Sequence, residues 1–88
     1  MHEEALLRDL RRQLVMLAER EHAARISRAE VWLGALSDVR EEQLRSAWPL
    51  LVAGTPAEGA TLDVRTSEES SDPRAQSVIL RSISVGGP

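Results

Sequence analysis

The sequence predicts an α+β fold in which two helices pack on one face of a three-stranded sheet, in the order α-β-α-β-β. Two segments repeat apolar residues at the three- and four-residue spacing of an amphipathic helix, and three segments alternate apolar and polar residues like half-buried strands. Helices that cover one face of a small sheet bury both kinds of apolar surface in a two-layer domain. A chain of 88 residues, 42% hydrophobic, suffices for one such core, so we expect a single domain over residues 1–88.

The first helix is expected at about residues 4–21. Its apolar positions recur on one side: Leu6, Leu7, Leu10, Leu14, Leu17 and Ala18. Glu3, Glu4 and Asp9 lie where negative charge complements the helix dipole. His22 follows the helix, where we interpret it as a polar helix-end residue rather than a ligand.

The stretch RISRAEVWLGAL alternates and predicts the first strand. Its apolar side carries Ala29, Val31 and Leu33, and its polar side carries Arg28, Glu30 and Trp32. A large aromatic side chain on the polar side has three explanations. Trp32 is an incidental exposed residue, or it packs under Arg28 and the third strand, or it contacts a partner or a second copy of the chain, because aromatic residues are enriched at interface cores. We therefore mark Trp32 as a candidate interface residue.

The second helix is expected at about residues 38–52. Asp38 or Ser37 would cap its start, and Pro49 should bend or shorten it because proline lacks the amide donor. Gly54 is a stop signal. The side facing the core carries Leu44, Ala47, Trp48 and Leu51.

Two more strands follow, at about residues 60–66 and 76–85. The first has Leu62 and Val64 facing the core and follows a turn in which Glu58 is interpreted as turn chemistry rather than as a ligand. The polar stretch SEESSDPR between the strands reads as a loop because it contains a proline and few apolar residues. The final Gly-Gly-Pro should fray.

Composition excludes several functions. The net charge of −3 argues against a nucleic-acid binder, and the absence of cysteine rules out disulfides, thiolate zinc sites and catalytic thiols. No apolar run approaches the roughly 18 residues of a membrane span, and the start is too acidic for a signal peptide, so we expect a cytoplasmic protein. No Ser/His/Asp or paired-carboxylate arrangement is supported, so we do not expect an enzyme.

The first three residues, Met1, His2 and Glu3, pose a chemical question. They are either a polar overhang or a metal site. With histidine in second place, the Met1 amine, the His2 amide, the His2 imidazole and the Glu3 amide can form a planar set of four nitrogens. Square-planar nitrogen coordination suits Ni(II) or Cu(II).

Four segments in register resemble one family, the hydrogenase nickel-incorporation proteins HypA/HybF. The chain begins Met1-His2-Glu3, its first strand ends in the turn Gly34-Ala35-Leu36-Ser37, and the segment Gly54-Thr55-Pro56-Ala57-Glu58-Gly59-Ala60 follows the second helix. The closing LRSISV is similar to the family's last strand. The resemblance implies transient Ni(II) binding at the N-terminus and delivery to a [NiFe]-hydrogenase large-subunit precursor, together with a nickel-handling GTPase.

The chain departs from the family at one place. Members insert a zinc-binding domain with two Cys-x-x-Cys pairs between the last two strands, where this chain has the cysteine-free loop of residues 66–75. We therefore expect no zinc, and we expect a HypA-like nickel-binding domain without its zinc domain. The alternative function is a metal-free adaptor that binds a hydrogenase subunit or maturation factor. We expect neither nucleic acid nor membrane as a partner, and include a weak homodimer among the expected states.

Overall fold

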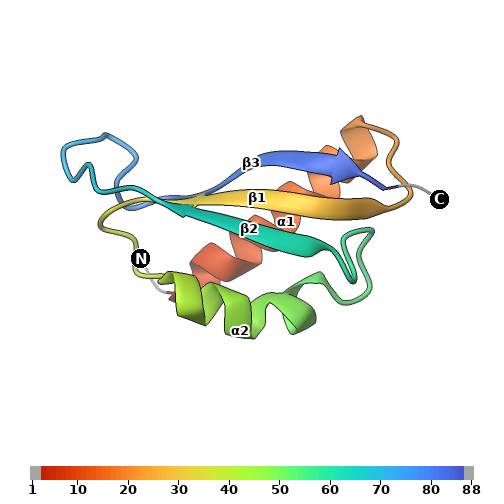
Figure 1. Ribbon diagram of the computed structural model, residues 1–88, viewed down its shortest axis with the longest axis horizontal. Helices are drawn as coiled ribbons and strands as arrows, with labels where there is room; N and C mark the ends of the chain where they lie inside the picture. The colour runs from red at the N-terminus through yellow and green to blue at the C-terminus, as the bar shows by residue number, and fades with distance from the viewer. Residues whose placement is uncertain (1–2, 87–88) are drawn as a thin grey trace.

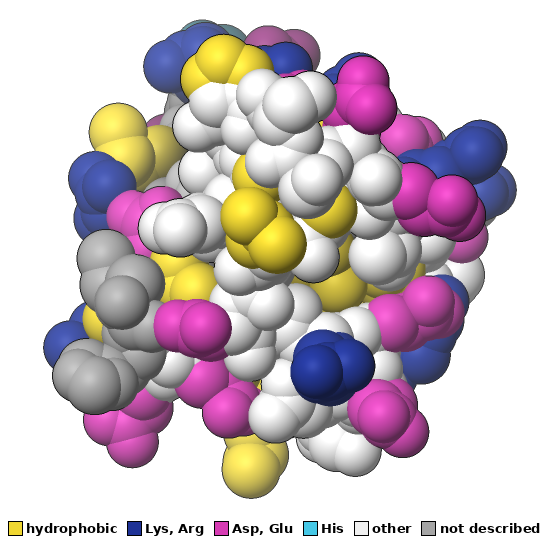
Figure 2. Space-filling model, turned by 90° about the vertical axis from the view of Figure 1, so that its left-hand side faces the viewer, with side chains coloured by type: hydrophobic (Ala, Val, Ile, Leu, Met, Phe, Trp, Pro, Cys, Tyr) yellow, Lys and Arg dark blue, Asp and Glu magenta, His cyan; other side chains and the backbone are white. Residues whose placement is uncertain are grey.

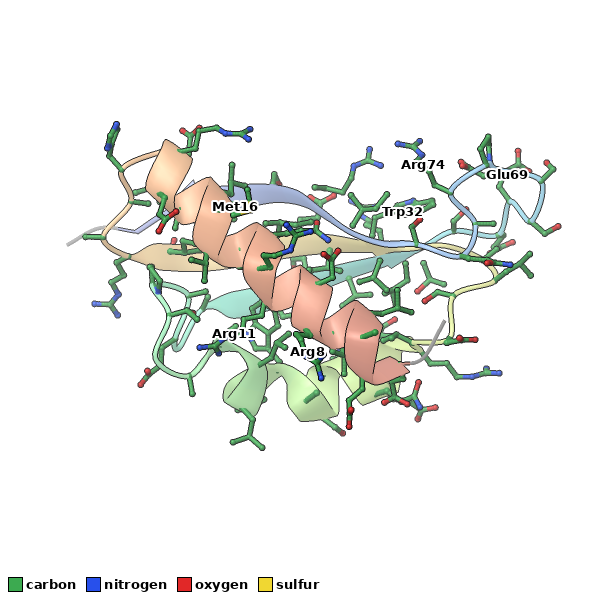
Figure 3. All side chains as sticks on the ribbon, turned by 180° about the vertical axis from the view of Figure 1, so that it is seen from behind. Arg8, Arg11, Met16, Trp32, Glu69 and Arg74 are labelled. Carbon is green, nitrogen blue, oxygen red and sulfur yellow. The ribbon has the colours of Figure 1, made fainter. Side chains whose placement is uncertain are left out.

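The computed structural model of the protein describes residues 3–86. Five elements follow one another along the chain: α1 (Glu3–Arg20), β1 (Ile26–Leu33), α2 (Glu41–Val52), β2 (Thr61–Thr66) and β3 (Val78–Val85). The predicted α+β class and the order α-β-α-β-β are confirmed. Both helices lie on the same side of the sheet, as the views from the front and from behind show (Figures 1 and 3).

The sheet has the strand order β2-β1-β3. β1 runs parallel to β2 and antiparallel to β3, so the first strand of the chain becomes the central one. A parallel pair needs a crossover connection, and α2 supplies it between β1 and β2. The direction of this pairing does not follow from the periodicity of the individual strands.

One continuous cluster of buried side chains fills the space between the helices and the sheet. From β1 it takes Ala29, Val31 and Leu33, which are at most 1% exposed, as the predicted alternation requires. The core is aliphatic apart from Trp48 of α2. The Trp48 indole nitrogen donates a hydrogen bond to the Ala60 carbonyl oxygen at 2.9 Å, so its one polar atom is satisfied.

The end of α1 confirms the interpretation of His22. His22 has φ of +54°, the left-handed conformation that commonly closes a helix. The His22 amide donates to the Glu19 carbonyl at 3.2 Å, and the Ala23 amide donates to the Ala18 carbonyl at 2.8 Å. These two bonds form a Schellman motif with histidine in the position usually held by glycine, and the buried Ala18 and Ala23 supply its apolar contact.

The start of α2 differs from the prediction. The helix begins at Glu41 with Arg40 as the residue before it, so neither Asp38 nor Ser37 is the cap. The Ser37 hydroxyl instead accepts a bond from the Val39 amide at 3.0 Å. That turn places the Val39 side chain in the core, where it is 2% exposed, and delays the helix. α2 continues past Pro49 to Val52, so the proline does not end it.

A candidate functional site at the start of the first helix

The structure places only one of the three predicted nickel-binding residues. Met1 and His2 lie outside the described residues, and Glu3 is the first residue of α1. The Glu3 side chain is exposed, and its Oε1 accepts a hydrogen bond from the Gln43 side-chain nitrogen of α2 at 3.2 Å. The first turns of the two helices therefore lie side by side.

Gln43 fixes this junction, and the sequence prediction did not single it out. Its Oε1 accepts a bond from the Arg40 amide at 2.8 Å, while its nitrogen donates to Glu3. The first bond is half of a capping box, in which the third helical residue reaches back to the residue before the helix. A Gln three residues after the capping residue Arg40 was the available signal. It was hidden because the expected start was Asp38 or Ser37.

A pocket of about 510 Å³ lies beside this junction, between the end of β1 and the start of α2. The buried side chains of Leu33 and Val39 belong to its lining. The Arg45 guanidinium, also in the lining, contacts Glu41 at 3.0 Å and donates to the Leu62 carbonyl of β2 at 3.1 Å. These contacts tie α2 to the edge of the sheet next to the candidate site.

The turn after β1 has a structural reason for its glycine. The Gly34 amide donates to the Ser77 carbonyl at 2.9 Å, and the Leu36 amide donates to the Ala75 carbonyl at 2.7 Å. A Cβ atom on Gly34 would lie 2.1 Å from the Ala75 oxygen, closer than real atoms approach. The loop between β2 and β3 is therefore attached directly to the turn at Gly34, and Ala75 is only 4% exposed.

Trp32 lies half-buried on the sheet face that the helices leave open. The Arg74 guanidinium lies above the Trp32 ring. Its central carbon is 5.7 Å from the ring centroid, within the range of a cation–π contact. Figure 3 shows these two side chains near each other, next to the loop that carries Glu69. Arg28 does not cover Trp32, because its side chain pairs with Asp63 on β2, whereas Trp32 is in register with Ile79 of the third strand. The interface role of Trp32 stays a prediction.

Glu58 behaves as predicted, and it does not join the junction at Glu3. Its Oε1 accepts a bond from the Gly54 amide at 2.8 Å, which closes the turn after α2. Within residues 3–86, no group of three or more His, Asp or Glu side chains is arranged to hold a metal ion.

In the described part of the chain, neither helix is long and apolar enough to cross a membrane.

The amino-acid sequence is similar to curated proteins over some 60 residues. The Hydrogenase maturation factor HypA of Thermococcus kodakarensis is 43% identical over 63 residues, which is 72% of this chain and 45% of the relative. The protein of the same name in Chlorobium limicola is 39% identical over 64 residues, covering 73% and 55%.

These relatives are longer proteins, and the chain spans about half of the length of each. A family model described as "Hydrogenase/urease nickel incorporation, metallochaperone, hypA" matches residues 1–72. The match includes the first three residues, the turn at Gly34, the segment after α2 and all of β2. On this match, the chain belongs to the HypA family of hydrogenase nickel-incorporation proteins.

Proposed function

We propose that this protein is a nickel metallochaperone for [NiFe]-hydrogenase maturation, which binds Ni(II) through its N-terminus and passes it to a hydrogenase precursor. The observation that carries the proposal is the sequence Met1-His2-Glu3 within a segment that matches the HypA family model. Its relatives are named hydrogenase maturation factors. The proposed ligands are the Met1 amine, the His2 imidazole and the backbone amides of His2 and Glu3.

The position of Glu3 supports this ligand set. As the first residue of α1, Glu3 has a backbone amide with no acceptor inside the helix, because the first four amides of any helix lack one. That amide can give up its proton to bind a metal without breaking a helical hydrogen bond. The side chain is exposed and contacts Gln43, which leaves it outside the core.

Nitrogen chemistry explains why such a site can release its metal. The amine and the imidazole both bind protons, so protons compete with nickel for these two ligands. Ordering a chain end around an ion also costs conformational entropy. Both effects keep the affinity modest, which suits a protein that delivers its metal.

Nickel titration of untagged protein tests the site, with His2→Ala and with wild-type protein whose Met1 amine is acetylated. Both changes should reduce nickel affinity by at least about tenfold, because each removes one of four ligands. The wild-type complex should show the weak visible absorption of planar Ni(II), and binding should weaken as the pH falls and the imidazole protonates.

His22→Ala is the matched control, since His22 is the other histidine and closes α1 at its far end. It should leave nickel affinity unchanged. If the acetylated protein binds nickel as tightly as the wild type, the amine is not a ligand and the proposed site is wrong.

We further propose that the protein acts in the cytoplasm with a hydrogenase large-subunit precursor or a nickel-handling GTPase, and that nickel is held only transiently. We infer from the resemblance that the loop of residues 66–75 stands in place of the family's zinc domain, and the chain contains no cysteine. We therefore propose that it holds no zinc. Elemental analysis after dialysis tests this, and one tightly held zinc per chain would contradict it.

A metal-free adaptor is the second candidate, and the open sheet face favours it. Trp32 lies half-buried on that face in register with Ile79 of β3, next to Arg74 of the loop between β2 and β3. Under this alternative, Trp32→Ala would weaken partner or homodimer contacts, while His2→Ala would leave hydrogenase maturation intact. Maturation assays of the two variants separate the functions, because only the metallochaperone requires His2.

A further inference from the structure

Charge is distributed unevenly over the molecule. Three segments meet at one end: the start of α1, residues 34–42 between β1 and the first turn of α2, and the loop of residues 67–77. They carry eight of the fourteen carboxylates but two of the eleven arginines. Two further arginines reach this surface from outside these segments, Arg8 to Glu4 at 3.9 Å and Arg45 to Glu41 at 3.0 Å, so carboxylates outnumber arginines there by eight to four. We call this surface the acidic end; its charged residues are Glu3, Glu4, Asp38, Glu41, Glu42, Glu68, Glu69 and Asp72, with Arg8, Arg40, Arg45 and Arg74. The remainder of the chain has an excess of arginine.

The three segments are held together by contacts already described. Gln43 joins the start of α1 to the start of α2, and the Leu36 amide joins the turn after β1 to the loop at Ala75. The charges therefore sit on a fixed frame. In residues 3–86, no ion pair joins Glu68 or Glu69 to another side chain, so both carboxylates are available to an external cation.

An exposed apolar side chain lies within the acidic end. Leu36 is 52% exposed, although its backbone is fixed to Ala75 at 2.7 Å. Figure 2 views this end of the molecule and shows hydrophobic side chains near the middle of the face, with carboxylates toward its margins. An apolar centre inside a polar rim is the usual anatomy of a protein–protein interface.

The sign of the charge decides which occupant fits. A second copy that presented the same end would be repelled by like charges, and nucleic acids and bilayer surfaces are anionic too. We propose that the acidic end docks a protein partner through a surface of that partner rich in Lys and Arg. This rests on the proposed function, in which the partner is the GTPase or the hydrogenase precursor that exchanges nickel with this chain.

The placement of Glu3 connects docking to delivery. Glu3 belongs both to the acidic end and to the proposed ligand set, so a partner docked here lies beside the proposed metal site. Complementary charge mainly accelerates encounter and is weakened by salt, whereas the apolar contact at Leu36 mainly slows dissociation. The two parts of the surface therefore predict different kinetic effects.

Binding kinetics of the purified GTPase and of the purified hydrogenase precursor to the full chain test the proposal. The double variant Glu68→Gln/Glu69→Gln should lower the association rate by about fivefold at 50 mM salt and by less than about twofold at 500 mM. Leu36→Ser should raise the dissociation rate by about fivefold. Glu19→Gln/Glu21→Gln removes the same charge at the other end of α1 and should change neither rate.

Docking and metal binding are measured separately. Glu68→Gln/Glu69→Gln should bind nickel like the wild type, and His2→Ala should lose nickel yet still dock. If the wild-type chain does not bind nickel, the proposed nickel site is wrong, and the docking proposal is unaffected. The docking proposal is overturned if neither partner binds the wild-type chain, if the control pair has an equal effect, or if the loop variant alters nickel affinity instead of partner binding.

Discussion

His22 has a backbone conformation that glycine would adopt with less strain, so the wild-type residue is not the most stable one at this position. Its φ of +54° is disfavoured for a residue with a Cβ atom and is free of strain for glycine. His22→Gly should therefore raise the free energy of unfolding by about 0.5–1 kcal/mol in urea denaturation. His22→Ala keeps the Cβ atom and should bring no comparable gain. A glycine variant no more stable than the wild type would contradict this account of the helix end.

Asp9 gives the molecule a small dependence of stability on pH. Side-chain hydrogen bonds from Arg12 and Gln13 lower the pKa of Asp9 below its ordinary value of 3.8. A carboxyl whose pKa is lowered by folding stabilises the folded state above its unfolded pKa. That contribution is lost as the pH falls through the folded pKa. The pair with Arg12 is largely exposed, at 66% and 44% for Arg12 and Asp9, so the effect is small.

Asp9→Asn should accordingly lower the free energy of unfolding at pH 7 by less than about 1 kcal/mol. The difference between wild type and variant should shrink as the pH falls below about 3.8. Urea denaturation of both proteins at pH 7 and pH 3 checks the sign. A difference that grew toward low pH would show that Asp9 is not stabilised as a carboxylate.

Among the elements, α1 and β3 are joined by the side chain of one glutamine. Gln13 accepts a hydrogen bond from the Leu80 amide at 2.9 Å and donates to the Val78 carbonyl at 3.3 Å. β3 pairs with β1 on its other side and has a register irregularity next to Leu80. Gln13 therefore satisfies backbone groups at the outer edge of β3, which would otherwise form an open strand edge.

Removing this amide should destabilise the fold. Gln13→Ala leaves the partly buried Leu80 amide without its acceptor, and we expect a loss of about 1–2 kcal/mol in the free energy of unfolding. Gln76→Ala, at an exposed position in the turn before β3, should change it by less than about 0.5 kcal/mol. Equal losses in the two variants would show that the edge of β3 does not depend on Gln13.

At the scale of the whole molecule, one buried cluster connects all five elements. Unfolding of such a small core should be cooperative, with tryptophan fluorescence and far-ultraviolet circular dichroism giving the same transition midpoint. Trp48 reports on the core and Trp32 on the open face beside Arg74. Two separate midpoints would mean that the sheet and the helices do not share one cooperative unit.

The molecule is elongated and measures 40 × 21 × 18 Å (Figure 1). The strands lie along the long axis, so the connections cluster at its two ends. Arg11 of α1 stabilises α2 far from the acidic end by donating to the Leu51 carbonyl at 2.6 Å (Figure 3). The acidic end is thus separated from the closing turns of both helices.

The sequence by itself determined the elements, because their periodicity is a local property. The stripe of Leu10 and Leu14, the alternation of Val31 and Leu33, and the helix-end role of His22 all follow from residues a few positions apart. The coordinating chemistry of the first three residues is also local, although its use stays a proposal. The resemblance to HypA rested on such short segments, and the family match confirmed it.

Only the tertiary structure decided how distant segments meet. The parallel pairing of β1 with β2, the contact of Gly34 with Ala75 and the contact of Glu3 with Gln43 join residues about 30 to 40 positions apart. The start of α2 moved to Glu41 for the same reason, since Val39 must first reach the core. Local pattern selects an element's type, whereas packing of all elements on one core fixes its direction, its ends and its neighbours.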